Sequence, residues 1–248
     1  KELVNYFGSK NTSEFMSIIK NNVNCPIITP SSYYQMIFNQ ELGLKIITIA
    51  HSLDPKVLEM LNEHKREVAK TGSVAGNVIL VPSRLEPKQK GQDLVIKAVS
   101  KVLETRLNEN VILKLSGLDE TYRENAVSLK EMSKKLRINV EVGKYGNILE
   151  EIAKADIVCL PSRYESFGYA AQESIALGKT TILSDIPTYE EISRDAPNAY
   201  LFISESVNDL ASKISSRLKN DKVDLYPPAE WYRRYDPDEW VAKYTAFI

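Results

Sequence analysis

The chain has 248 residues, of which 43% are hydrophobic and 26% charged, the mix of a globular protein with a sizeable core. Its 32 basic and 33 acidic side chains nearly cancel, which argues against a general binder of nucleic acid or another polyanion. No apolar run approaches the roughly 18 residues that cross a bilayer, and Cys25 and Cys159, both in apolar runs, suggest buried thiols of a reducing compartment instead of a disulfide framework.

Short, β-branched apolar runs recur along the chain, and we expect them to be strands buried on both faces. In chain order they occupy residues 27–29, 46–49, 78–81, 111–115, 138–142, 157–160 and 180–183. Amphipathic stretches lie between them. In residues 91–107, for example, Val95, Val99 and Val102 share one helical face. This alternation predicts an α/β fold with a doubly wound parallel sheet.

Two composition changes suggest the boundaries of the main domain. Residues 65–77 carry the weakest pattern and are expected to form a linker or solvated loop. A second boundary is expected near Pro227-Pro228, and beyond it Asp236 should cap a final helix. The predicted parts are a short αβ segment at 1–54, a complete α/β domain of roughly six strands at 55–229 and a closing helix at 230–248.

The first candidate site follows the expected strand at 78–81. Arg84 and Lys90 come after this strand, and a helix is expected to begin near Gly91. Both side chains should therefore lie at the carboxyl edge of the sheet, where open α/β sheets bind ligands. A guanidinium, a partly exposed ammonium and free helix N–H groups suit a phosphate or diphosphate. A basic surface turn is the alternative.

The second candidate site follows the expected strand at 157–160. Glu165 lies in the loop, a helix begins near Gly168, and Glu173 lies about a turn and a half into that helix. Gly168 would let an anion approach the backbone, and Glu173 can reach back toward the same ligand. A carboxylate that accepts two O–H groups suits a vicinal diol such as ribose. The alternatives are a solvated loop acid and an exposed helix residue.

We expect no metal site. Asp236-Pro237-Asp238 matches the Asp-x-Asp pattern by which some glycosyltransferases hold a metal, but its position at a helix start favours capping. The two histidines and two cysteines have spacings unlike those of a compact zinc site.

The order and spacing of these residues resemble the retaining glycosyltransferases of family 4, which have the GT-B fold. That family carries Arg and Lys in a strand-loop-helix, then Glu-x-Phe-Gly, then a second Glu with seven residues between the acids. The matching residues are Arg84, Lys90, Glu165, Phe167, Gly168 and Glu173. The similarity covers roughly residues 46–202, and Ser83 stands where the family usually has Gly.

The resemblance implies two Rossmann-like domains, of which the C-terminal one binds a nucleotide-sugar donor. Arg84 and Lys90 would hold the donor diphosphate, Glu173 the ribose and Glu165 the transferred sugar. The implied catalytic residues are Glu165, Arg84 and Lys90. The other implied donor contacts are Ser166, Phe167 and Gly168 near the donor oxygens, and Gly143, Lys144 and Tyr145 at the base.

The resemblance also implies the reaction and its partners. A sugar would pass, with retention and without a metal or other cofactor, from a UDP- or GDP-linked donor to a sugar, lipid-linked or protein acceptor. Residues 1–54 would be the end of an N-terminal acceptor domain, onto which Trp231 and Trp240 would pack. We expect a cytoplasmic protein with no nucleic-acid partner, and peripheral membrane contact is compatible with the family. Two alternatives stay open: a catalytically silent nucleotide-sugar binding module and a GT-B-type nucleotide-sugar epimerase.

Overall fold

The computed structural model describes residues 17, 27–42, 46–71, 77–105, 111–144, 146–219 and 225–247. The chain divides into two compact units. The larger unit is Leu53–Arg233, and the smaller combines Lys1–Ser52 with Arg234–Ile248.

The larger unit is built on a six-stranded sheet. In chain order its strands are β3 (Asn77–Pro82), β4 (Val111–Leu118), β5 (Val140–Lys144), β6 (Ile157–Leu160), β7 (Thr180–Ser184) and β8 (Ala199–Phe202). Every neighbouring pair is parallel, and the order across the sheet is β5-β4-β3-β6-β7-β8. This is the doubly wound arrangement, in which the strand order reverses between the first strand, β3, and the fourth, β6. The predicted fold class is confirmed.

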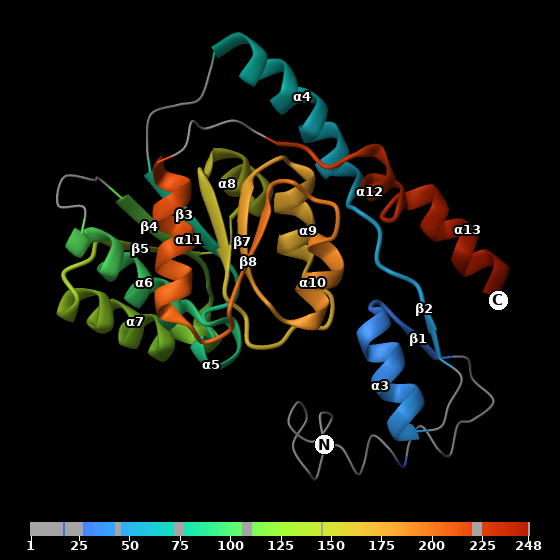
Figure 1. The fold of residues 1–248 in the computed structure, drawn as a ribbon, viewed down its shortest axis with the longest axis horizontal. Helices are drawn as coiled ribbons and strands as arrows, with labels where there is room; N and C mark the ends of the chain where they lie inside the picture. The colour runs from blue at the N-terminus through green and yellow to red at the C-terminus, as the bar shows by residue number, and fades with distance from the viewer. Residues whose placement is uncertain are drawn as a thin grey trace. The chain divides into compact units, whose positions relative to one another are not determined.

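Helices cover both faces of this sheet (Figure 1). On one face α6 (Gln92–Thr105) packs beside α7 (Arg123–Lys135) and α11 (Val207–Lys219). On the other, α9 (Tyr169–Ala176) packs beside α8 (Ile148–Lys154) and α10 (Pro187–Ser193), and α4 (Pro55–Thr71) contacts α9. The remaining short helices of the unit are α5 (Pro87–Lys90), α12 (Ala229–Arg233) and a 3₁₀ turn at Glu120–Tyr122.

The face predicted for α6 is the buried one. Val95, Val99 and Val102 are all buried in a hydrophobic core that also contains Ile79 of β3 and Leu113 of β4. Burial of this apolar stripe against the sheet accounts for the stability of the helix.

Two element predictions are wrong in part. Helix α4 continues to Thr71, so residues 65–71 are not a loop, and residues 72–76 lie outside the described part of the chain. The segment is polar, but its Lys, Arg, Glu and Ala residues are strong helix formers. Strand β5 begins at Val140 instead of residue 138, because Arg137 adopts a left-handed conformation (φ 57°) and Ile138 donates its N–H to Ser133 O, which closes α7.

The smaller unit contains a parallel pair, β1 (Ile27–Thr29) and β2 (Ile46–Thr48), joined through α3 (Ser32–Leu42). It also contains α13 (Pro237–Phe247). The Asp236 carboxylate accepts the N–H groups of Asp238 and Glu239 at 2.8 and 3.1 Å, which confirms the predicted cap.

The predicted closing helix is in fact two helices, α12 and α13. Trp231 of α12 is buried in the larger unit and donates its indole N–H to Ile192 O at 2.8 Å. The expectation that Trp231 packs on another domain is therefore wrong, whereas Trp240 lies in the smaller unit with its ring 4.4 Å from that of Tyr244.

Cys159 is a free, buried thiol, and burial raises its pKa far above the ordinary value. Cys25 lies outside the described residues. Among the described helices, none is both long enough and apolar enough to span a bilayer.

Candidate functional site

The two predicted loops meet where the strand order reverses. Arg84 follows β3 and Glu165 follows β6, and these strands are neighbours, with Ile79 paired to Ile157. Carboxyl ends of parallel strands share one edge of the sheet, and the switch point at that edge is the place where such folds bind ligands.

Backbone contacts join the two loops. Arg163 donates its N–H to Gln89 O at 2.8 Å. Gly91 ends α5 in the left-handed region (φ 68°), and a Cβ atom there would lie 2.1 Å from Pro161 O. Glycine is required at position 91 by its conformation and by this close approach. Lys90 is the last residue of α5, a short helix that the sequence did not predict.

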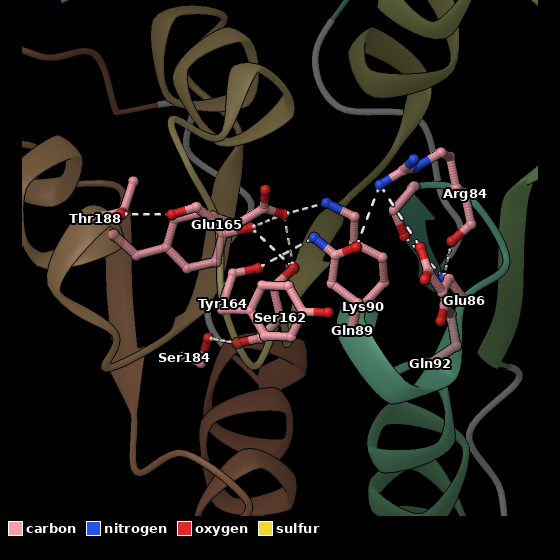
Figure 2. Close-up of polar contacts among 12 residues, drawn as sticks. Arg84, Glu86, Gln89, Lys90, Gln92, Ser162, Tyr164, Glu165, Ser184 and Thr188 are labelled. Carbon is pink, nitrogen blue, oxygen red and sulfur yellow. Dashed lines mark hydrogen bonds and ion pairs between the residues drawn. The ribbon is translucent and has the colours of Figure 1, made fainter. Parts of the chain in front are cut away.

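Lys90 and Glu165 form an ion pair across the joined loops (Figure 2). The distance from Lys90 Nζ to Glu165 Oε1 is 2.5 Å, and the two side chains are only 11% and 12% exposed. The basic surface turn and the solvated loop acid, the alternatives for these two residues, do not describe this arrangement. Lys90 is also less exposed than we expected.

Two hydroxyl groups bind the same oxygen of Glu165. Ser162 Oγ donates to Glu165 Oε1 at 2.9 Å, and the Tyr189 hydroxyl lies 3.2 Å from it. Among the described residues, Glu165 Oε2 has no hydrogen bond or ion pair. The backbone of the loop is held as well, since Thr188 Oγ1 donates to Glu165 O at 2.8 Å (Figure 2).

Sequence reasoning assigned no role to Thr188 or Tyr189. Both lie in the first turn of α10, which follows β7, and the carboxyl end of β7 lies at the same edge of the sheet as that of β6. Their position after a strand was the available signal. The polar contacts of their side chains could not be read from the pattern.

Arg84 lies on the same loop as Lys90 but outside the ion pair. Its side chain is 46% exposed, with Nη2 3.2 Å from Gln89 Oε1 and 3.6 Å from Glu86 Oε2 (Figure 2). Ser83, which replaces the usual glycine, is buried, and its hydroxyl accepts from Gln92 Nε2 at 2.9 Å. The additional side chain is therefore satisfied within the protein.

Glu173 lies on α9 and is half-buried, so it is not the exposed helix residue of the alternative. Burial, with a smaller contribution from the charge of Asp54, raises the pKa of Glu173 to about 7. Its carboxylate makes no hydrogen bond or ion pair within the described part of the chain. A group of this kind can accept hydrogen bonds from a ligand.

Gly168 is the N-cap residue of α9 and lies in the left-handed region (φ 89°). A Cβ atom there would lie 2.8 Å from Tyr189 Cε1, so the neighbouring phenol ring, together with the backbone conformation, accounts for glycine at this position. Next to it, Phe167 is buried with its ring packed edge-on against Tyr169, and Ser166 is exposed.

The segment predicted to bind the base ends the edge strand β5. Gly143 is half-buried, Lys144 is exposed, and Tyr145 lies outside the described residues. Nearby, Ser116 at the end of β4 donates a hydrogen bond to the Glu151 carboxylate of α8. Strand β4 separates β5 from β3, so this segment lies on the β5 side of the switch point.

Comparison with known proteins gives relatives in sequence and in structure. A phosphatidyl-myo-inositol mannosyltransferase of Mycobacterium leprae is 27% identical over 165 residues, which are 65% of this chain and 43% of that protein. A solved glycosyltransferase from Rickettsia africae has a TM-score of 0.77 and 17% identity, covering 94% of this chain and 66% of that one. The Anabaena protein HepE, solved with UDP and glucose, has a TM-score of 0.72 and 18% identity, with 94% and 67% covered.

The solved structures confirm the fold, since the parallel six-stranded sheet flanked by helices matches that of GT-B glycosyltransferases. The chain spans less than half the length of the curated relatives it matches. The family described as Glycosyl transferases group 1 matches residues 63–229, which include both joined loops and Glu173. With most of its length matched, the chain belongs to the glycosyl transferases group 1 family.

Proposed function

We propose that this chain carries the donor-binding half of an enzyme that transfers a sugar from a nucleotide-sugar donor to an acceptor. The observation that carries the proposal is the Lys90–Glu165 pair at the switch point of the sheet. The Lys90 ammonium, proposed to bind the diphosphate, and the Glu165 carboxylate, proposed to bind sugar hydroxyls, lie 2.5 Å apart. Such a pair can contact both sides of the bond that breaks, between the anomeric carbon and the diphosphate.

The two cations suit the charge that develops when the diphosphate departs. The Lys90 ammonium has three N–H donors, of which the contact with Glu165 uses one. The exposed Arg84 guanidinium can bind a second phosphate oxygen. Donors fixed in place stabilise the leaving group more in the transition state than in the ground state. Because two cations can neutralise this charge, we propose a reaction that needs no metal or other cofactor.

We assign the ribose hydroxyls to Glu173. Its half-buried carboxylate has a raised pKa, so two O–H donors from a ligand would stabilise its charged form. The donor is proposed to be UDP- or GDP-linked. UDP is the nucleotide in the Anabaena structure, and the Mycobacterium leprae relative is named as a mannosyltransferase.

Retention is proposed from the resemblance of the Glu-x-Phe-Gly motif and its following Glu to the retaining family. The acceptor would attack from the face that the diphosphate leaves, and a donor phosphate oxygen would take its proton. Glu165 is not proposed as a covalent nucleophile, because retaining hydrolases that use one place a second carboxylate close by as the acid, and the sequence shows no obvious such pair. The acceptor is proposed to be a sugar, a lipid-linked acceptor or a protein, bound with the help of an N-terminal domain. The proposed location is the cytoplasm.

Calorimetric titration with UDP, GDP, UDP-glucose and GDP-mannose tests donor binding. Arg84→Ala should weaken binding of the nucleoside diphosphate by about tenfold, the loss expected for one charge-assisted hydrogen bond. In a protein that includes the acceptor domain, Glu165→Ala should cut turnover strongly and leave diphosphate affinity within a few-fold. Normal turnover would remove Glu165 from the site, and binding without any transfer would favour the silent binding module.

Two further measurements test the finer points. The anomeric configuration of the product, read by NMR, distinguishes retention from inversion. Turnover that survives a strong chelator supports the metal-independent reaction, and loss of turnover restored by a divalent cation would contradict it. Conversion of the donor to its epimer without an acceptor would instead identify an epimerase.

A further inference from the structure

The hydrogen bonds to the Glu165 carboxylate are unevenly distributed. Oε1 is contacted by Lys90 at 2.5 Å, by Ser162 at 2.9 Å and by Tyr189 at 3.2 Å. Within the described residues Oε2 has none of these contacts. A carboxylate oxygen has two lone pairs, so Oε1 is saturated and Oε2 can still accept.

We propose that Tyr189, together with Ser162, is a positioning residue that holds Glu165 so that Oε2 receives a hydroxyl group of the transferred sugar. This inference rests on the proposed function, because it takes Glu165 as the sugar-binding carboxylate. It adds a residue outside the Glu-x-Phe-Gly motif and assigns separate roles to the two oxygens of Glu165.

The three donors come from three different elements, which is why they can set the orientation of the carboxylate. Lys90 ends α5, Ser162 follows β6 and Tyr189 belongs to α10. Rotation of the carboxylate plane away from this orientation would lengthen contacts on all three sides. Ser162 is itself held, since Ser184 Oγ donates to its carbonyl oxygen at 2.5 Å (Figure 2).

In its contact with the Glu165 carboxylate, Tyr189 can only be the donor, and its single O–H is shared between Glu165 Oε1 and Ser162 Oγ. Its side chain is buried, at 1% exposure, and burial with the nearby Glu165 charge raises its pKa well above the ordinary value, so the hydroxyl keeps its proton. The hydroxyl lies 3.2 Å from both Glu165 Oε1 and Ser162 Oγ. Its ring lies against Gly168, where even a Cβ atom would be too close, so the phenol is tightly packed on that side.

The competing explanation is that Tyr189 serves only as a core aromatic residue. In that case its ring matters and its hydroxyl does not affect sugar recognition. Tyr189→Phe separates the two explanations because it keeps the ring and removes the O–H. Tyr232→Phe is a matched control, since it also removes a phenol hydrogen bond, the 2.7 Å bond to Ala176 O, outside the Glu165 network.

The experiment titrates the whole chain and each variant with UDP-glucose, UDP, GDP-mannose and GDP, and records melting temperatures on the same preparations. For the donor that binds, Tyr189→Phe should lower the affinity for the nucleotide sugar by about fivefold, which corresponds to the loss of roughly one hydrogen bond. The affinity for the nucleoside diphosphate should stay within about twofold of the wild-type value. Tyr232→Phe should leave the ratio of the two affinities unchanged.

A double-mutant cycle tests whether Tyr189 acts through Glu165. In a Glu165→Ala background, Tyr189→Phe should not change the affinity ratio further. An unchanged ratio in the single variant, or an equal change in the Glu165→Ala background, would overturn the inference. A wild-type chain that binds no nucleotide would refute the proposed function itself. A wild-type chain that binds nucleoside diphosphates and has no higher affinity for the nucleotide sugars would refute only the Glu165 assignment and this inference.

Discussion

Replacing Lys90 with Met removes the ammonium and keeps a stem of similar length. The Glu165 carboxylate, only 12% exposed, then loses its 2.5 Å partner and keeps the hydroxyl groups of Ser162 and Tyr189. Removal of one member of a fully buried pair costs about 3–5 kcal/mol. Because two donors and some solvent contact remain, we expect the free energy of unfolding to fall by about 1–3 kcal/mol, the cost of one lost charged hydrogen bond.

Chemical and thermal denaturation measure this change, and the melting temperature should fall by about 3–9 °C for a protein of this size. On the same preparations, affinity for the nucleoside diphosphate should fall by about one to two decades. Lys114→Met is the matched control. Its pair with Glu141 has a longer contact, 3.3 Å, and both side chains are more than 40% exposed. That control should change stability by about 0.5 kcal/mol or less.

A double variant tests whether the loss of stability comes from a Glu165 charge left without its partner. Lys90→Met with Glu165→Gln replaces the ion pair by neutral groups, so the double variant should be more stable than the sum of the single losses predicts. Strict additivity of the losses in unfolding free energy would refute the argument. So would a Lys90→Met protein with wild-type stability and diphosphate affinity, and Lys90 would then be interpreted as part of a basic surface turn.

Three further predictions concern α9. Glu173→Gln should lower the affinity for a ribonucleoside diphosphate and hardly change the affinity for its dideoxy analogue. Equal losses of affinity for the two ligands in calorimetry would exclude the ribose role. Since the pKa of Glu173 is raised to about 7 and ribose O–H donors favour the carboxylate, ribonucleotide affinity relative to the dideoxy analogue should be constant above pH 7 and fall by up to about tenfold per pH unit below it. A flat ratio from pH 5.5 to 8 would contradict this. Gly168→Ala should lower unfolding free energy by about 1–3 kcal/mol, because the new methyl would lie 2.8 Å from Tyr189 in a left-handed conformation; Gly146→Ala, where the nearest atom is the end of a flexible Glu151 side chain at 3.3 Å, is the control.

The regular part of the fold was predictable because its signals are local. The β-branched runs at 157–160 and 180–183 became β6 and β7, and the face of α6 that carries Val95 and Val99 is buried as the 3.6-residue period predicts. Strand β8 was not identified. The polar end of α4 was misread because helix propensity, without an apolar period, was its only signal.

The candidate site was predictable as a set of residues and not as an arrangement. The motif placed Lys90 and Glu165 at one edge of the sheet, but their contact joins residues 75 positions apart and depends on the backbone bond between Arg163 and Gln89. The contribution of Tyr189 depends on how α10 packs. No spacing along the sequence encodes that packing.

The joined loops also restrict how this protein can be redesigned. Proteins often acquire new specificity by inserting or deleting loop residues. Here Gly91 leaves room for Pro161 O, and Arg163 binds Gln89 O, so a change of length on one side would displace the opposite wall as well. Engineering of donor preference in this chain therefore has to work by exchanging side chains on a backbone of fixed length, and libraries that vary loop length at these two positions will mostly yield proteins with a broken site.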